Sequence, residues 1–74
     1  MSNTLQLQDL PQGKCAQVVD LIGRSADVLQ LCEIGMRIGV PLVMMQTGKA
    51  CVIRVNGSKI CLRPHQVQVI VQPV

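Results

Sequence analysis

The sequence predicts a small, mainly β domain with one short helix after its first strand. Three observations support this prediction. The chain has only 74 residues, one helix-ending signal occurs before its midpoint, and short apolar segments of strand length follow that signal. A chain of this length forms one domain, near the lower size limit at which a hydrophobic core is sufficient. Few small folds place one helix early and then only strands, so the order favours a small barrel or a compact α+β domain.

The composition supports a packed core and narrows the possible functions. Hydrophobic residues make up 49% of the chain, yet Phe, Tyr and Trp are all absent. Proteins that bind single-stranded nucleic acid stack bases on aromatic rings or arginine planes, and grooves for polyproline ligands are lined by aromatics. Neither function is favoured here. The net charge of +3 is compatible with an acidic protein partner or a weak RNA contact, without choosing between them.

A lead-in segment and the first strand are expected at the start of the chain. Three leucines of the lead-in are candidate core anchors: Leu5, Leu7 and Leu10. Pro11 and Gly13 then indicate a turn, and residues 14–21 form the predicted strand. Alternation divides the side chains of that strand between two faces, with Cys15, Val19 and Leu21 on one and Ala16, Val18 and Asp20 on the other.

The helix is predicted over residues 26–34. Ser25 is the expected N-cap, and Asp27 in the first turn complements the positive end of the helix. The segment is apolar over most of its surface, so we expect it to pack against the strands. Gly35 is the expected stop, because glycine readily adopts the left-handed conformation that ends helices. Met36 is then expected to contact the last helical turn.

Four further strands are predicted after the helix, over residues 41–46, 50–55, 58–62 and 67–71. Asn56-Gly57 separates two of them and indicates a two-residue type I′ hairpin turn. This turn fixes the register and pairs Val55 with Ser58, Arg54 with Lys59, Ile53 with Ile60, Val52 with Cys61 and Cys51 with Leu62. One face of the hairpin is then expected to meet the core: Cys51, Ile53, Val55, Ser58, Ile60 and Leu62.

The opposite face of this hairpin carries three cations, Arg54, Lys59 and Arg63, beside Ala50, Val52 and Cys61. Charged residues in such a pattern often form a solvated surface. The alternative is a binding face for an acidic protein surface or, less in keeping with the missing aromatics, for nucleic acid. We therefore select Arg54, Lys59 and Arg63 as candidate partner-binding residues and expect no nucleic acid as the main partner.

The four cysteines, at positions 15, 32, 51 and 61, do not form a C-x-x-C pair. Cys51 and Cys61 fall on opposite hairpin faces, which disfavours a disulfide between them. We expect buried cytosolic thiols that act as small hydrophobic groups. A transition-metal site is the alternative: Cys61 and His65 are candidate ligands, with Cys15, Cys32 or Cys51 as a third, and these soft ligands suit zinc or copper.

Catalysis and membrane insertion have little support in the sequence. A cysteine nucleophile requires a histidine and an orienting group, and the single His65 lies four residues beyond Cys61. No carboxylate pair and no phosphate-binding glycine loop is present, so we expect no enzyme. No apolar run approaches the roughly 20 residues of a membrane span, and residues 1–10 lack the pattern of a signal peptide. We expect a cytoplasmic protein.

Four segments resemble the ferrous iron transport protein A (FeoA) family. Residues 31–39, LCEIGMRIG, resemble its helix-and-turn signature L-x-x-[LI]-G-[MLI]-x-P-G, with Ile38 in the place of the usual proline. Residues 51–63 and 67–71 resemble its final hairpin, Leu-Arg turn and last strand. The lead-in, residues 7–13, also matches. The resemblance spans nearly the whole chain, so residues 1–74 are interpreted as a single FeoA-like domain.

The resemblance implies an SH3-like barrel of five or six strands with one helix after the first strand. It also implies a small cytosolic accessory protein of bacterial ferrous-iron uptake. The partner would be the membrane ferrous-iron permease that carries a GTPase domain, and the role would be that of an interaction module. Transition-metal binding or nucleic-acid binding by a small barrel are the alternatives.

Overall fold

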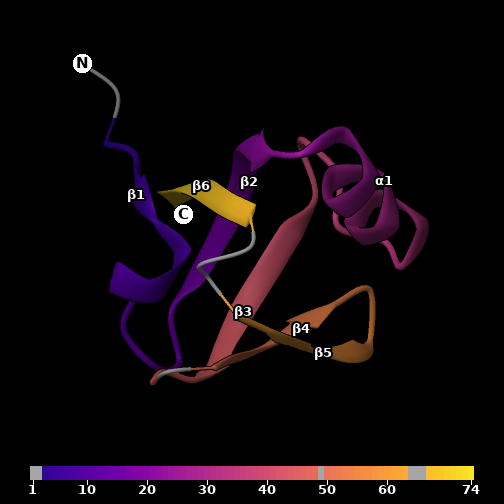
Figure 1. The fold of residues 1–74 in the computed structure, drawn as a ribbon. Coiled ribbons are helices and arrows are strands. Elements are labelled where there is room, and N and C mark those ends of the chain that lie inside the picture. Colours follow the sequence, from indigo (N-terminus) through magenta and orange to yellow (C-terminus); the bar gives the residue numbers. More distant parts are fainter. Residues whose placement is uncertain (1–2, 49, 64–66) are drawn as a thin grey trace.

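One six-stranded antiparallel sheet forms most of the molecule (Figure 1). The structure is a computed structural model that describes residues 3–48, 50–63 and 67–74. The strands are β1 (Leu5–Gln6), β2 (Cys15–Gly23), β3 (Pro41–Gln46), β4 (Cys51–Val55), β5 (Ser58–Leu62) and β6 (Val67–Pro73). They lie side by side in the order β1-β6-β2-β3-β4-β5. The prediction of a mainly β, SH3-like domain with one short α-helix is confirmed.

The lead-in contains two elements that the sequence pattern did not predict. Strand β1 pairs with β6, and the 3-10 helix η1 (Leu7–Asp9) follows it directly. The α-helix therefore comes after the second strand, not the first. Strand β1 was not predicted because a strand of only two residues shows no alternation of side chains. Leu7 and Leu10 are buried as expected, and the Lys14 N–H donates to the Pro11 carbonyl oxygen at 3.2 Å, which confirms the turn.

Strand β2 is longer than predicted and is interrupted by a β-bulge. Its pairing with β6 shifts register between Val18 and Asp20, so Val19 is an extra residue. Ala16 and Val18 are buried before the bulge, and Leu21, of opposite parity, packs against the core after it. The predicted grouping of Cys15 with Leu21 on one face is therefore wrong, because a bulge breaks the two-residue period of a strand.

The helix α1 (Ser25–Glu33) begins one residue earlier than predicted. Arg24 occupies the N-cap position without a side-chain cap, so the prediction of Ser25 as N-cap is wrong. The reason is that β2 continues through Gly23, which leaves only Arg24 to join the strand to the helix. In place of a cap, the Arg24 Nε donates a hydrogen bond to the Asp27 carboxylate at 3.1 Å.

The end of α1 agrees with the predicted glycine stop. Gly35 has a φ of +108°, its N–H donates to the Cys32 carbonyl oxygen at 3.1 Å, and the Met36 N–H donates to the Leu31 carbonyl oxygen at 2.9 Å. These two bonds form a Schellman motif, which satisfies carbonyl groups at the helix end. Met36 is fully buried. The stop therefore also fixes a core residue under the last helical turn.

The hairpin formed by β4 and β5 has the predicted register at all five residue pairs. Asn56 and Gly57 have φ values of +52° and +81°, as a type I′ turn requires. The core face is confirmed with one correction, since Ser58 lies on that face but is exposed at the hairpin tip. Strand β4 begins at Cys51 and not at residue 50, while the bounds of β3 and β5 are as predicted.

The last strand, β6, extends two residues beyond the predicted end at Val71. Pro73 pairs with Ala16 there. The partner on the other side, β1, ends opposite Ile70 and Val71, so no neighbouring strand requires the N–H that proline lacks. Strand β6 thereby connects the shortest strand to the centre of the sheet.

The core lies between the inner face of the sheet and the helix. Leu31 is the buried residue of α1, and Met36 and Met44 belong to the same buried cluster. No polar or charged side chain is buried within the part of the chain that the structure describes. The domain is therefore held together by aliphatic and thioether packing, as expected for a core without aromatic rings.

Replacement of Ile53 by Ala tests this packing. Ile53 has no exposed surface, so the variant should lose about 2–5 kcal/mol of unfolding free energy. Ile38→Ala is the matched control, because Ile38 is 64% exposed and its truncation should cost less than about 0.5 kcal/mol. Urea denaturation measures both values, and equal losses would contradict this assignment of the core.

Candidate interaction surface on the β4–β5 hairpin

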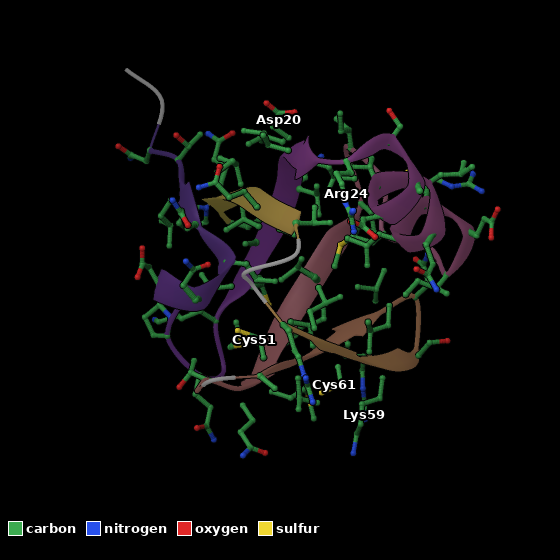
Figure 2. All side chains as sticks on the ribbon, in the orientation of Figure 1. Asp20, Arg24, Cys51, Lys59 and Cys61 are labelled. Carbon is green, nitrogen blue, oxygen red and sulfur yellow. The ribbon has the colours of Figure 1, made fainter. Side chains whose placement is uncertain are left out.

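The three predicted cations, Arg54, Lys59 and Arg63, are all exposed. Arg54 lies directly opposite Lys59, and Figure 2 shows Lys59 pointing away from the body of the molecule. Like charges at opposed positions of two antiparallel strands destabilise the pair. The hairpin therefore carries an electrostatic cost that an anionic partner would relieve.

Strand register extends this surface across the sheet. Cys15, Val43, Arg54 and Lys59 occupy successive positions in one row across β2, β3, β4 and β5. No acidic residue belongs to this row. Within the described residues, the one ion pair joins Arg24 to Asp27 at the start of α1. We call Arg54, Lys59 and Arg63 the basic face.

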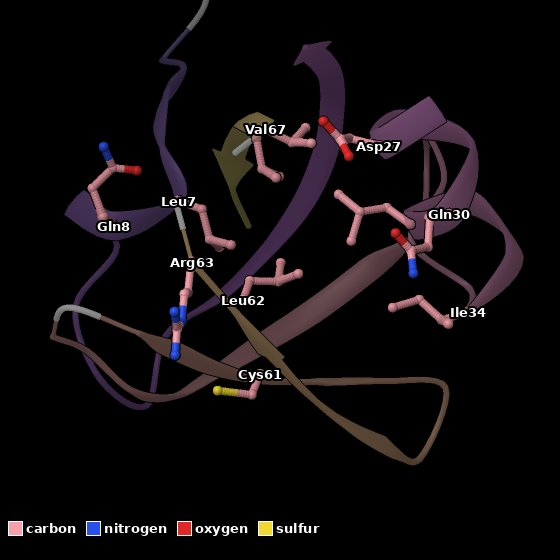
Figure 3. Close-up of a pocket in the computed structure, with 11 residues that line it drawn as sticks. Leu7, Gln8, Asp27, Gln30, Ile34, Cys61, Leu62, Arg63 and Val67 are labelled. Carbon is pink, nitrogen blue, oxygen red and sulfur yellow. The ribbon is translucent and has the colours of Figure 1, made fainter. Parts of the chain in front are cut away.

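A second feature is a hollow of about 230 Å³ between α1, η1, the end of β5 and the start of β6. Its apolar lining is contributed by Leu7, Leu31, Ile34, Leu62, Val67 and Val69. Gln8, Asp27 and Gln30 add polar groups from η1 and α1 (Figure 3). Sequence analysis did not detect this hollow, because its walls come from segments that are far apart in the chain.

The hollow and the basic face share strand β5. Cys61 and Leu62 of β5 line the hollow, as does Arg63, which directly follows this strand. In Figure 3, however, the side chains of Cys61 and Arg63 point away from it, whereas Leu62 lies among the apolar residues. Alternation along β5 and into Arg63 thus places an apolar wall on one side of the chain and the cations Lys59 and Arg63 on the other.

The four cysteines differ in exposure. Cys51 is buried and Cys32 is partly buried, but Cys15 and Cys61 are exposed. The expectation of buried thiols is therefore confirmed for Cys51 and wrong for Cys15 and Cys61. Cys51 and Cys61 are on opposite faces, as predicted, and neither forms a disulfide. Burial raises the pKa of the Cys51 thiol above 9.0; a backbone hydrogen bond from Gly48 opposes this shift, and the nearby Cys61 adds to it.

The candidate metal ligands are not brought together in the described part of the structure. No group of three or more His, Cys, Asp or Glu side chains with metal-binding geometry occurs there. His65 lies outside the described residues, so the pairing of Cys61 with His65 stays a prediction. No helix among the described residues is long and apolar enough to span a membrane.

Comparison with known proteins identifies the family. Residues 5–72 match the model of the FeoA domain. This chain belongs to the FeoA domain family. This match confirms the predicted FeoA-like identity of the domain. The family is linked to ferrous-iron uptake. No curated protein matches the chain.

Solved structures confirm the FeoA-type fold. An FeoA protein from Chlorobium tepidum has a TM-score of 0.87 at 20% identity, and the match covers 95% of this chain and 70% of that one. An iron uptake regulatory protein (FeoA) has a TM-score of 0.83 at 18% identity, with 96% and 97% covered. A manganese-dependent transcriptional repressor has a TM-score of 0.85 at 13% identity, but the match covers 99% of this chain and only 42% of the repressor.

The raised pKa of Cys51 predicts a loss of stability at alkaline pH. Above pH 9.0 the thiol ionises more readily in the unfolded chain than in the fold, where burial raises its pKa. The contribution of the protonated Cys51 thiol to the free energy of unfolding is therefore complete below that pH and is lost as the pH rises. We expect Cys51→Val to reduce the fall in unfolding free energy between about pH 7 and about pH 10, measured by urea denaturation.

Cys15→Val is the matched control for this experiment, because Cys15 is exposed on the outer face of the sheet. It should keep the pH dependence of the unchanged protein. If Cys51→Val and the unchanged protein lose stability in parallel, a thiol buried in the core does not cause the alkaline loss.

Proposed function

We propose that this protein is a non-catalytic, cytoplasmic accessory protein of ferrous-iron uptake that docks on the membrane ferrous-iron permease through its GTPase domain. Membership of the FeoA domain family supports a role in ferrous-iron uptake. One similar structure, described as an iron uptake regulatory protein, supports an accessory role. The docking surface is the basic face.

The observation that carries this proposal is the unbalanced charge of the hairpin. Arg54 and Lys59 are directly opposed, and both side chains are exposed. Positive patches attract negative ones at interfaces and speed up encounter, while mismatched charges suppress wrong partners. A partner surface with carboxylates would replace a repulsive contact with an attractive one, so binding and local stability would improve together.

The direct test is binding to the full-length permease from the same organism, held in lipid nanodiscs, with and without GTP. We expect binding that weakens as salt is added, because exposed charges are screened. Dependence on GTP would indicate regulation of the GTPase cycle. Absence of binding in every nucleotide state would reject the proposal, and stronger binding to added RNA than to the permease would redirect the basic face to nucleic acid.

Lys59→Glu should weaken permease binding about tenfold, equivalent to about 1.4 kcal/mol. The reason is that the substitution repels the carboxylates that the basic face attracts. Lys14→Glu is the matched control, since Lys14 is exposed in the loop before β2 and outside the basic face. It changes the net charge equally and should leave the affinity within about twofold. Equal losses for the two variants would show a non-specific charge effect.

A further inference from the structure

Strand β5 is an edge of the sheet. Among the described residues, the strand order places β4 on one side of it and no strand on the other, whereas the opposite edge, β1, has only two residues. Beyond the β4–β5 ladder, no backbone hydrogen bond of Lys59 or Cys61 is found within the described segments. An edge strand of five residues with open backbone groups is a template for pairing with another chain.

The hairpin turn determines which backbone groups of β5 are open. A type I′ turn closes with a hydrogen bond between its first and fourth residues, here Val55 and Ser58. Antiparallel ladders alternate between bonded and non-bonded pairs. The pairs Arg54–Lys59 and Val52–Cys61 are therefore the non-bonded ones, and the N–H and C=O groups of Lys59 and Cys61 point away from β4.

The open backbone groups of Cys61 lie beside the hollow. Cys61 and Arg63 line it although their side chains point elsewhere (Figure 3), so their backbone faces it. Ligand pockets for small molecules usually measure about 300–1,000 Å³. The hollow of about 230 Å³ is smaller, and its apolar lining suits one or two aliphatic side chains. An open strand edge beside an apolar hollow has the two features that bind an extended peptide.

We propose that the open edge of β5 binds an extended segment of a partner protein by strand addition. This inference rests on the proposed function, which supplies the partner, the ferrous-iron permease. It adds the way in which the two proteins make contact. The residue opposite Cys61 forms backbone hydrogen bonds. Its two neighbours oppose Ile60 and Leu62, so their apolar side chains point toward the hollow. The next residues on either side oppose Lys59 and Arg63, where carboxylates meet the basic face.

The segment therefore has the pattern acidic, apolar, any, apolar, acidic. The two acidic positions share the outer face because side chains alternate along a strand. A cation in either position would face Lys59 or Arg63 and oppose binding. The basic face and the hollow thus contact alternate side chains of one segment. In strand addition such side-chain contacts give specificity, while the backbone hydrogen bonds give affinity.

The first experiment uses a capped peptide with the core Glu-Val-Thr-Leu-Glu and a control peptide with Lys-Val-Thr-Leu-Lys. Amide hydrogen exchange is followed by NMR on the intact chain. We expect the acidic peptide to slow exchange at Lys59 and Cys61 at least about tenfold, since open edge amides gain a partner. The amide of Ile60, already in the β4 ladder, should change less. No slowing at Lys59 and Cys61, or equal slowing by both peptides, would overturn the proposal.

Two pairs of variants separate the edge from the hollow. Cys61→Pro removes the open N–H of Cys61 without breaking the β4 ladder, as edge positions permit, and Cys61→Ala is its control for the lost thiol. Ile34→Asp places a charge on the wall of the hollow at a half-exposed position. Ile38→Asp is its control, because Ile38 is exposed and does not line the hollow.

We expect Cys61→Pro and Ile34→Asp to weaken peptide binding about tenfold or more, and each control to stay within about twofold. Circular dichroism confirms the fold of every variant. If Cys61→Pro does not fold, the exchange experiment and the Ile34→Asp pair still decide the outcome. Controls that weaken binding as much as their partners would overturn the proposal.

Permease binding distinguishes failure of this inference from failure of the proposed function. If the permease binds the unchanged protein and Cys61→Pro equally while Lys59→Glu weakens binding, the docking function stands and strand addition is wrong. If the permease does not bind at all but the acidic peptide slows exchange at Lys59 and Cys61, strand addition stands with another partner. A concentration-dependent dimer abolished by Cys61→Pro would assign the edge to a second copy of the chain and overturn the proposal.

Discussion

The type I′ turn at Asn56-Gly57 is the constraint on which the rest of this structure depends. Both residues have positive φ, and a two-residue loop permits only one register between β4 and β5. That register sends Ile53 and Ile60 into the core and places Arg54 opposite Lys59 on the outer face. It also fixes which backbone groups of β5 point toward β4. A slip of one residue would exchange core and surface along the whole hairpin.

Features that depend on neighbouring residues could be predicted from the sequence. The hairpin register and the glycine stop of α1 are set by Asn56-Gly57 and Gly35, whose backbone freedom is visible in the residue type alone. The bulge at Val19 could not be predicted, because it arises from the pairing of β2 with β6, whose residues lie about fifty positions away in the chain. The prediction of the N-cap of α1 was wrong for a related reason, since the pairing of β2 with β6 extends through Gly23.

The candidate site divides in the same way. The cations of the basic face lie on one hairpin, so alternation alone brings Arg54 and Lys59 together. The hollow requires α1 and η1 to approach the end of β5, and each contributes residues that also belong to the core, such as Leu7 and Leu31. An apolar residue beside a hollow and one in a packed core have the same sequence signal. Only the three-dimensional arrangement shows that Leu62 and Ile34 are left partly exposed.

The composition of the core explains how the domain tolerates an unsatisfied edge. No polar side chain is buried within the described residues, so every buried contact adds apolar packing and none requires a charged partner. The costs of the fold, which are the opposed cations and the open edge, are instead concentrated on the β4–β5 hairpin. A charged edge disfavours the pairing of two identical copies, because Lys59 and Arg63 of one copy would lie close to the same cations of the other and repel them. The same charges favour an acidic strand, so one arrangement protects the edge from aggregation and selects the partner that can cover it.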